Sequence, residues 1–150
     1  MISIAVSLAQ LGCIGRSPKA PGTVATVVAG IPAAYLLSLV PQYAAFPILI
    51  LFISGASYVS DKAENNLGKH DPQEVVIDEV AGYMVTMIGF TVTVKSLFLG
   101  LLLFRAFDIW KPWPVSLLHR EIPGGLWIVL DDVAAGICAH VFLWAILKIV

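Results

Sequence analysis

The sequence predicts an all-α protein, a compact helical bundle embedded in a membrane. Hydrophobic residues make up 59% of its 150 residues, charged residues make up 13%, and the mean hydropathy is +0.90. An average soluble domain carries roughly 25% charged residues, so this chain has too little charge to cover a water-facing globule of its size. No stretch alternates apolar and polar residues strongly enough to compete with helices. The length suits a single domain over 1–150.

The first half of the chain predicts a short interfacial helix followed by two long helices. Residues 2–14 are apolar enough for an amphipathic helix at the membrane surface, and a loop over 15–22 follows them. Residues 23–40 form an apolar run that Pro32 is expected to kink. The next run covers 43–59. Both runs approach the length of about 20 apolar residues that a membrane span needs.

The second half predicts three more helices, which brings the main helices to about five. A polar loop over 60–74 precedes a helix that runs to about Gly89. Another helix covers 96–110 and is stopped by Pro112, because the residue before a proline avoids helical geometry. The last helix covers 131–149 and is long enough to span. The two helices before it are short, so we expect them to form a shallow or tilted hairpin inside the bundle.

The basic residues predict how the bundle is oriented. Lys and Arg concentrate on the cytoplasmic side of short loops. If the loop over 15–22 faces the cytoplasm and the helices alternate in direction, seven of the nine basic residues fall on that side. Nearly all the carboxylates fall there too, so we expect polar loops and a functional site at the cytoplasmic face. A net charge of −1 offers no basic surface for nucleic acid, and nothing indicates a protein partner.

Two similar motifs carry most of these carboxylates. VVIDEVAG at 75–82 and IVLDDVAAG at 128–136 each place two adjacent acids before Val-Ala and a glycine. The acids are Asp78, Glu79, Asp131 and Asp132. Each pair is expected to open a helix, where acids complement the helix dipole, and this structural role is enough to explain one pair. With Asp108 there would be five carboxylates at one edge of an apolar bundle, and these need a compensating cation. Hard divalent ions, Mg²⁺ above all, take such oxygen ligands.

Basic residues near Asp108 point to phosphate as the partner of this cluster. Arg105 and Asp108 are three residues apart on one helix face, and Lys111 follows. Arg105 either forms an ion pair within its helix or, with Lys111, holds a phosphate. Thr23 opens the first long helix, where it can cap the helix or help its N–H groups to bind an anion. Metal, carboxylates and cations together suggest phosphoryl chemistry.

Four longer motifs give a family resemblance over most of the chain. They are PKAPGTVAT at 18–26, GKHDPQEVVIDEVAGY at 68–83, FRAFDIWKPWPV at 104–115 and GGLWIVLDDVAAG at 124–136. In order and spacing, the sequence resembles the phosphatidylglycerophosphatase A family. The resemblance implies hydrolysis of the terminal phosphomonoester of phosphatidylglycerophosphate, with Mg²⁺, to phosphatidylglycerol and inorganic phosphate. It also implies a multi-pass protein of the bacterial plasma membrane that works among membrane lipids and faces the cytoplasm.

These observations define an expected site and two alternatives to it. The expected catalytic and metal-binding residues are Asp78, Glu79, Asp108, Asp131 and Asp132. The expected phosphate-binding residues are Arg105, Lys111 and Thr23. One alternative is a transporter or ion pathway that uses the acidic cluster, although such sites usually lie near the bilayer midplane. The other is a structural membrane protein whose acids only cap helices.

Overall fold

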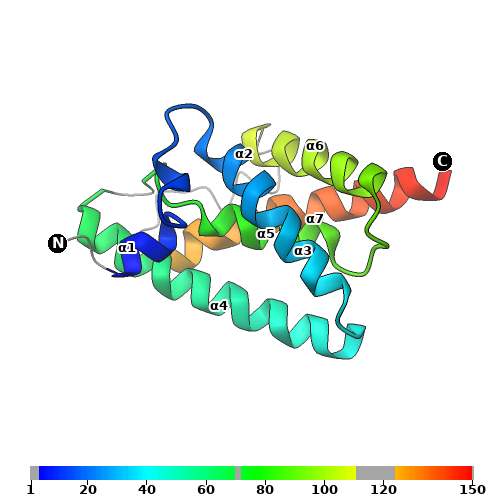
Figure 1. Ribbon diagram of the computed structural model, residues 1–150, viewed down its shortest axis with the longest axis horizontal. Helices are drawn as coiled ribbons and strands as arrows, with labels where there is room; N and C mark the ends of the chain where they lie inside the picture. The colour runs from blue at the N-terminus through cyan, green and yellow to red at the C-terminus, as the bar shows by residue number, and fades with distance from the viewer. Residues whose placement is uncertain (1–3, 70–71, 111–123, 150) are drawn as a thin grey trace.

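A computed structural model describes residues 4–69, 72–110 and 124–149, and within these ranges it contains helices and no strand. The predicted all-α fold is therefore confirmed. In chain order the elements are α1 (Ile4–Ala9), η1 (Ile14–Arg16), α2 (Pro21–Ala25), η2 (Thr26–Gly30), α3 (Ile31–Ser38), α4 (Gln42–Leu67), α5 (Ile77–Met87), α6 (Val94–Trp110) and α7 (Gly125–Ile149). Figure 1 shows the longer helices side by side around α5.

Three helical segments are long and apolar enough to cross a membrane, and they are Pro21–Ser38, Gln42–Leu67 and Gly125–Ile149. Large apolar side chains such as Leu36, Leu51 and Val141 are more than half exposed on these helices. Lipid is the solvent that tolerates such a surface, so the prediction of a membrane bundle is confirmed. As expected, α5 and α6 are shorter, and the 11 residues of α5 extend only about 16 Å.

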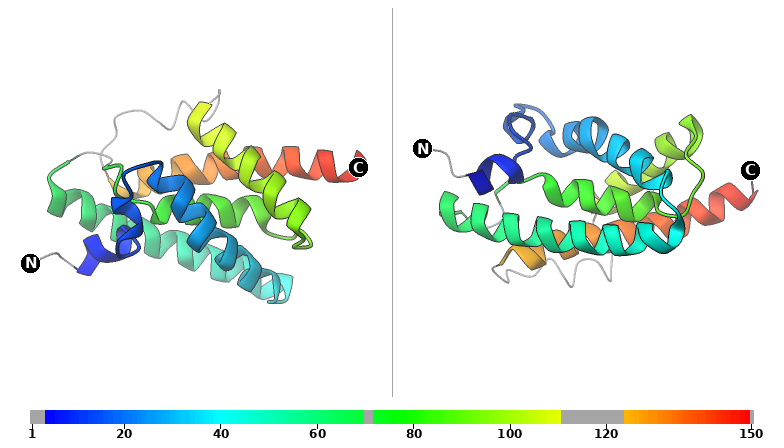
Figure 2. Two further views of the ribbon diagram at one scale, coloured as in Figure 1. Left: turned by 45° about the horizontal axis from the view of Figure 1, so that its top comes forward. Right: turned by 60° about the horizontal axis from the view of Figure 1, so that its bottom comes forward.

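The helices alternate in direction along the bundle. The α2–α3 segment, α5 and α7 run one way, and α4 and α6 return (Figures 1 and 2). The starts of α5 and α7 and the end of α6 therefore lie toward the same end of the bundle, at the left of Figure 1. Lys95 at the start of α6 and Lys148 at the end of α7 lie toward the other end. This agrees with the threading that the basic residues predict.

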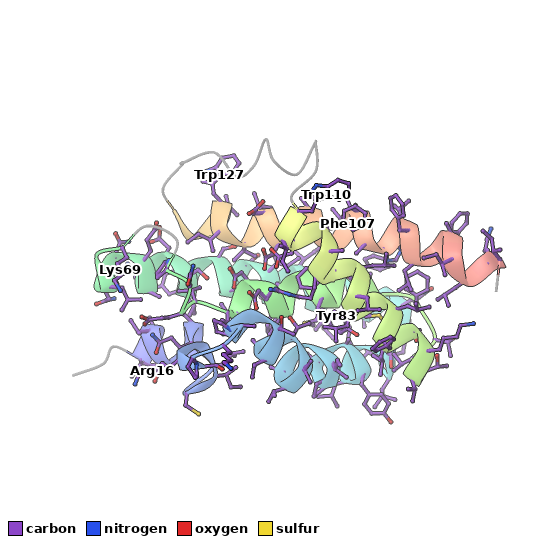
Figure 3. All side chains as sticks on the ribbon, turned by 90° about the horizontal axis from the view of Figure 1, so that it is seen from above. Arg16, Lys69, Tyr83, Phe107, Trp110 and Trp127 are labelled. Atoms are coloured by element: carbon purple, nitrogen blue, oxygen red, sulfur yellow. The ribbon has the colours of Figure 1, made fainter. Side chains whose placement is uncertain are left out.

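Helix α5 is the centre of the fold. Nine of its 11 residues are buried, and it contacts α7, α4, α6 and α3. Tyr83 of α5, Phe104 of α6 and Leu143 of α7 are completely buried together. The Tyr83 hydroxyl also donates a hydrogen bond to the carbonyl of Leu97, 2.9 Å away (Tyr83 is labelled in Figure 3). The short helix is thus enclosed by longer ones, and it also contacts its neighbour α6 inside the bundle.

Close contact between α5 and α7 explains the glycine in each of the two similar motifs. A Cβ atom added to Gly136 would overlap the carbonyl oxygen of Gly82. One added to Gly82 would lie 2.6 Å from the carbonyl oxygen of Asp132 and 2.6 Å from the ring of Phe104. Only glycine leaves room for backbones this close. The two motifs therefore meet each other in space, and each carries its acids to the same place.

The predicted polar loop over 60–74 is wrong in its first half, because α4 continues to Leu67. No proline or glycine interrupts 60–67, and Ser60, Ala63 and Glu64 are buried on that part of the helix. The helix ends at Gly68, whose φ of 61° is the left-handed conformation that favours glycine. The second span is thus followed by two further turns of polar helix.

The predicted start of the last helix is also wrong, because α7 begins at Gly125 rather than at 131. The carboxylate of Glu64 accepts a hydrogen bond from the backbone N–H of Gly124 (3.1 Å), and that of Asp61 accepts one from Gly125 (3.4 Å). Helix α4 therefore supplies the acids that cap the start of α7, as helix dipoles favour. We expected Asp131 and Asp132 to open the helix, but they lie in its second turn.

The N-terminal region departs from prediction in two places. The interfacial helix is shorter than 2–14, since Leu11 and Gly12 have positive φ and end the helical path after α1. The run over 23–40 is helical as predicted, but it widens into the π-helical turn η2 immediately before Pro32. Such a wide turn is common next to a proline, because proline has no backbone N–H to donate within the helix.

Candidate functional site

Three helices bring the five predicted carboxylates to one end of the bundle. Asp78 and Glu79 lie in the first turn of α5, and Asp108 lies near the C-terminal end of α6. Asp131 and Asp132 come from α7. The close approach of α5 to α7 at their glycines places the two acid pairs beside each other. The structure therefore assembles a set that the sequence could only suggest.

All five carboxylates are withdrawn from solvent. The exposed fractions are 7% for Asp78, 6% for Asp131 and 5% for Asp132. The side chains of Glu79 and Asp108 are 16% and 12% exposed. Acids that merely cap surface helices have no need of such burial. The cluster is thus a group of mostly buried polar side chains in an otherwise apolar bundle.

Arg105 joins two of the helices through this cluster. Its Nη1 atom lies 2.6 Å from Asp108 Oδ2 on its own helix and 3.3 Å from Glu79 Oε1 on α5. The ion pair within α6 is therefore confirmed, and Arg105 also reaches an acid of the cluster. A guanidinium between two carboxylates is well placed to exchange one of them for a phosphate oxygen.

Asp132 is the most enclosed member of the cluster. Its charge interacts with those of Asp78, Asp108, Glu79 and Asp131. Its Oδ2 atom is buried and has no hydrogen-bond donor within the part of the chain that the structure describes. A buried carboxylate whose charge is repelled by four others is costly unless positive charge compensates it. Among residues 4–69, 72–110 and 124–149, the cation in ion-pair contact with the cluster is Arg105.

The donor set suits a hard divalent cation. All five candidate ligands are carboxylates, the oxygen donors that Mg²⁺ takes, and the buried Oδ2 of Asp132 is an oxygen in need of such a partner. Within the described ranges, no three His, Cys, Asp or Glu side chains already stand in metal-binding geometry. The contacts of Arg105 with Glu79 and Asp108 account for part of this, since they turn both carboxylates toward the guanidinium. Convergence on a metal would require these side chains to change rotamer.

Gly22 is a site residue that the sequence analysis missed. The carboxylate of Glu79 occupies the place where a Cβ atom on Gly22 would stand, so the first turn of α2 lies directly against the cluster. Thr23 follows in the same turn, but it does not cap the helix as proposed, because the N-cap residue is Ala20. The signal was present in Pro21-Gly22-Thr23, where a small residue follows a helix-opening proline. Lys111, the other predicted phosphate-binding residue, lies outside the described residues.

A helical bundle with membrane-length apolar helices, and with carboxylates and a guanidinium gathered at one end, defines a class, the integral membrane proteins with a cluster of charged residues at one end. The family model described as phosphatidylglycerophosphatase A matches residues 7–147, which is most of the chain. The chain therefore belongs to the phosphatidylglycerophosphatase A family. The family's name is that of a phosphatase, which confirms the predicted class of enzyme.

Individual relatives agree with the family match. Phosphatidylglycerophosphatase A of Escherichia coli (strain K12) is 32% identical over 88% of this chain and 77% of its own length. The protein of the same name from Haemophilus influenzae is 32% identical over 88% of this chain and 82% of its own. A protein of Bacteroides thetaiotaomicron, named as a candidate phosphatidylinositol-3-phosphatase, is 30% identical over 86% and 84%. No solved structure matches the chain at a significant level.

We expect Gly22→Ala to lower phosphatase activity by about 100-fold, since the added methyl group must displace the carboxylate of Glu79 and misplacement on the scale of 1 Å has this effect. The measurement is phosphate release by the purified variant, with its helix content checked by circular dichroism. Gly55→Ala is the matched control, because a methyl group there meets nothing within 4 Å. Equal activity of the two variants would show that the position of Glu79 does not matter.

Proposed function

We propose that this protein hydrolyses the terminal phosphomonoester of phosphatidylglycerophosphate and releases phosphatidylglycerol and inorganic phosphate. The observation that carries the proposal is the cluster of five carboxylates, three buried and two mostly buried, with Arg105, assembled from α5, α6 and α7 at one end of a membrane bundle. Family membership supports the substrate, since two relatives bear the name of that phosphatase. The proposed substrate is a lipid, and a lipid can reach a site at one end of a membrane bundle without leaving the bilayer.

We assign Mg²⁺ to the carboxylate cluster. The residues that would hold it are Asp78, Glu79, Asp108, Asp131 and Asp132. When bound, it would neutralise charge on the phosphoryl group and make water a better nucleophile. The support for this assignment is the all-oxygen donor set, the surplus of negative charge and the buried Oδ2 of Asp132.

The chain's own residues divide the remaining work. One carboxylate orients a water molecule and takes its proton as the water oxygen bonds to phosphorus. The bond from phosphorus to the glycerol oxygen then breaks, and that oxygen keeps the electron pair and is protonated. Arg105, released from Glu79 or Asp108, stabilises the negative charge on the phosphoryl oxygens. Thr23 and Lys111 are proposed as further contacts to the phosphate.

We also propose that the site faces the cytoplasm of a bacterial plasma membrane. Arg16 and Lys19 precede α2, Lys62 lies in the last two turns of α4 and Lys69 follows that helix, all at the site's end of the bundle, while Lys95 and Lys148 lie toward the other end. The excess of basic residues at the site's end is typical of a cytoplasmic face. Labelling of single cysteines introduced at Lys69 and Lys95, in intact cells, tests this orientation.

We expect phosphate release from phosphatidylglycerophosphate to stop when EDTA removes divalent ions and to return on addition of Mg²⁺. The physical reason is that the carboxylate cluster repels a phosphate unless positive charge offsets it. The assay uses purified protein in detergent, with phosphatidic acid and phosphatidylinositol 3-phosphate as comparison substrates. Release that continues unchanged in EDTA would exclude the metal, and a preference for either comparison lipid would exclude the proposed substrate.

The transporter alternative makes a different prediction. A carboxylate pathway across the membrane would give ion flux in proteoliposomes without phosphate release. The acids lie at or near the ends of α5 and α6 and in the second turn of α7, rather than at the middle of the spans. This placement favours chemistry at the membrane surface.

A further inference from the structure

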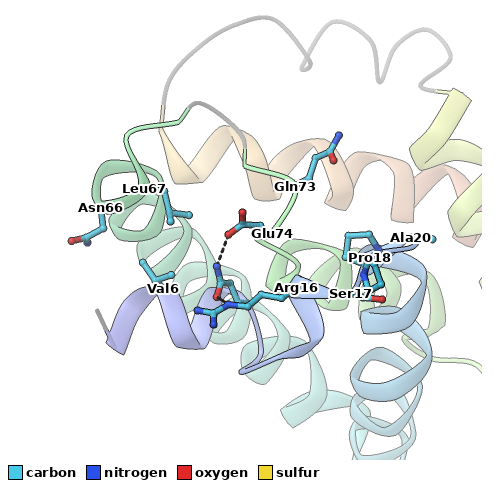
Figure 4. A pocket seen from close by; sticks show the side chains of 12 residues that line it. Val6, Arg16, Ser17, Pro18, Ala20, Asn66, Leu67, Gln73 and Glu74 are labelled. Atoms are coloured by element: carbon cyan, nitrogen blue, oxygen red, sulfur yellow. Dashed lines mark hydrogen bonds between the residues drawn. The ribbon is translucent and has the colours of Figure 1, made fainter. Parts of the chain in front are cut away.

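A polar cavity lies at the same end of the bundle as the carboxylate cluster. It has a volume of about 740 Å³ and lies between α1, η1, the end of α4 and the segment that precedes α5 (Figure 4). Its polar lining includes Gln10, Arg16, Ser17, Asn66 and Glu74. None of these residues belongs to the carboxylate cluster, so the cavity is a separate feature with amide, hydroxyl and guanidinium groups in its lining.

A chain of hydrogen bonds orients Arg16 in this cavity. Gln10 is 1% exposed, and its Nε2 atom donates to Glu74 Oε2 at 2.8 Å. Its Oε1 atom accepts a bond from Arg16 Nε at 3.0 Å. The dashed line at Glu74 in Figure 4 marks the first of these bonds. A Cβ atom on Gly15 would overlap the carbonyl oxygen of Glu74, which shows how tightly the neighbouring backbone is held.

The remaining donors of Arg16 face outward from this support. Within the described ranges, its two Nη groups donate no hydrogen bond, and no carboxylate lies within 4.0 Å of them. Glu74 is also balanced by Lys69, whose Nζ atom lies 3.9 Å from Glu74 Oε1. Within the described ranges, the Glu74 carboxylate therefore has Lys69 in ion-pair contact, and Arg16 lies beside it across the Gln10 side chain. The cavity therefore offers positive charge to an anion, whereas the carboxylates of the cluster alone would repel one.

We propose that this cavity is a second site, which binds a phosphate group through the guanidinium of Arg16. A guanidinium whose Nε is already held presents its two Nη groups as a fork, and this fork matches the oxygens of phosphate. The phosphate belongs either to free inorganic phosphate or to the head group of an anionic lipid. Both can reach the cavity, because α1 beside it exposes the apolar Ile4 and Leu8 as a helix at the membrane surface does.

The cavity also adjoins the proposed reaction site. Pro21 lines the cavity, and the next residue, Gly22, lies against the carboxylate of Glu79. The first turn of α2 therefore borders both. The binding of phosphate at Arg16 requires no hydrolysis, so this inference stands or falls independently of the proposed function.

The test is direct binding by the purified full-length protein in a phosphate-free detergent with EDTA, where the carboxylate cluster repels anions. The probes are radiolabelled inorganic phosphate and a soluble short-chain phosphatidylglycerol. We expect Arg16→Gln to weaken the binding of one probe by at least about tenfold, the effect of losing one charged hydrogen bond. Arg16→Lys, which keeps the charge and loses the fork, should weaken it by a smaller factor.

Lys19→Gln is the matched control, because Lys19 is an exposed cation nearby that does not line the cavity. The affinity of this variant for the probe should stay within about twofold of wild type. Circular dichroism checks that each variant is folded. If Arg16→Gln does not fold, Arg16→Lys still tests the proposal. The probe whose binding depends on Arg16 identifies the source of the phosphate. The proposal is overturned if neither probe binds, or if both Arg16 variants bind as wild type does. Hydrolysis assays on the same samples report separately on the proposed function.

Discussion

Asp132→Asn should reduce phosphate release from phosphatidylglycerophosphate by about 100- to 1,000-fold, the usual cost of removing one group that acts on the developing charge. Asp132 is the most enclosed carboxylate of the cluster, and its charge interacts with those of the other four. Asparagine keeps the shape of the side chain and removes the charge that would hold a cation. The initial rate at saturating Mg²⁺ is the measurement, with a Mg²⁺ titration to detect weakened binding.

The matched control for this variant is Asp61→Asn. Asp61 is also an acid near the start of α7, but its carboxylate accepts a bond from Gly125 rather than joining the cluster. Activity within a few-fold of wild type is expected, since an asparagine oxygen can accept the same bond. Replacement of the other four cluster acids singly by Asn or Gln extends the test. If all five variants keep near-normal Mg²⁺-dependent activity, the assignment of the cluster is wrong.

Gly136→Ala should destabilise the protein by about 1–3 kcal/mol, the range for overpacking a close contact, and should abolish most activity. The new methyl group would overlap the carbonyl oxygen of Gly82, so α7 must move away from α5. That movement separates the two acid pairs, because α5 carries one pair and α7 the other. Thermal unfolding in detergent and phosphate release measure the two effects.

Gly55→Ala again provides the comparison, because it makes the same change in a helix where nothing lies within 4 Å. Its stability should match or slightly exceed that of wild type, since glycine inside a helix is about 0.5–1 kcal/mol less favourable than alanine. A Gly136→Ala variant that unfolds at the wild-type temperature would contradict the close contact between α5 and α7. A Gly136→Ala variant that is stable but inactive would show that the distance between α5 and α7 controls activity without changing stability.

Composition and repeated motifs were enough to predict the all-α membrane bundle, its three long helices and the meeting of the acids at one end. Helix ends were harder to predict, because they depend on contacts between distant segments. The start of α7 at Gly125 requires the carboxylates of Asp61 and Glu64, which lie about 60 residues earlier. Nothing local to 125–131 shows that these caps are available.

Side-chain partners at the site were predictable only within one helix. The spacing of Arg105 and Asp108 predicts their ion pair, whereas the contact of Arg105 with Glu79 depends on how α6 packs against α5. The place of Gly22 against Glu79 likewise depends on packing between α2 and α5. Residues that bear charge were found from sequence, and the small residue that makes room for one of them was not.

The capping of α7 by α4 means that the polar end of α4 helps to position Asp131 and Asp132. Asp131 and Asp132 lie two turns into α7, so the point at which that helix starts sets the depth of both acids in the membrane. Asp61 and Glu64 hold that starting point from outside the apolar part of the span. If the cluster binds a lipid phosphate as proposed, two acids outside the cluster, Asp61 and Glu64, help to set the depth at which the two groups meet.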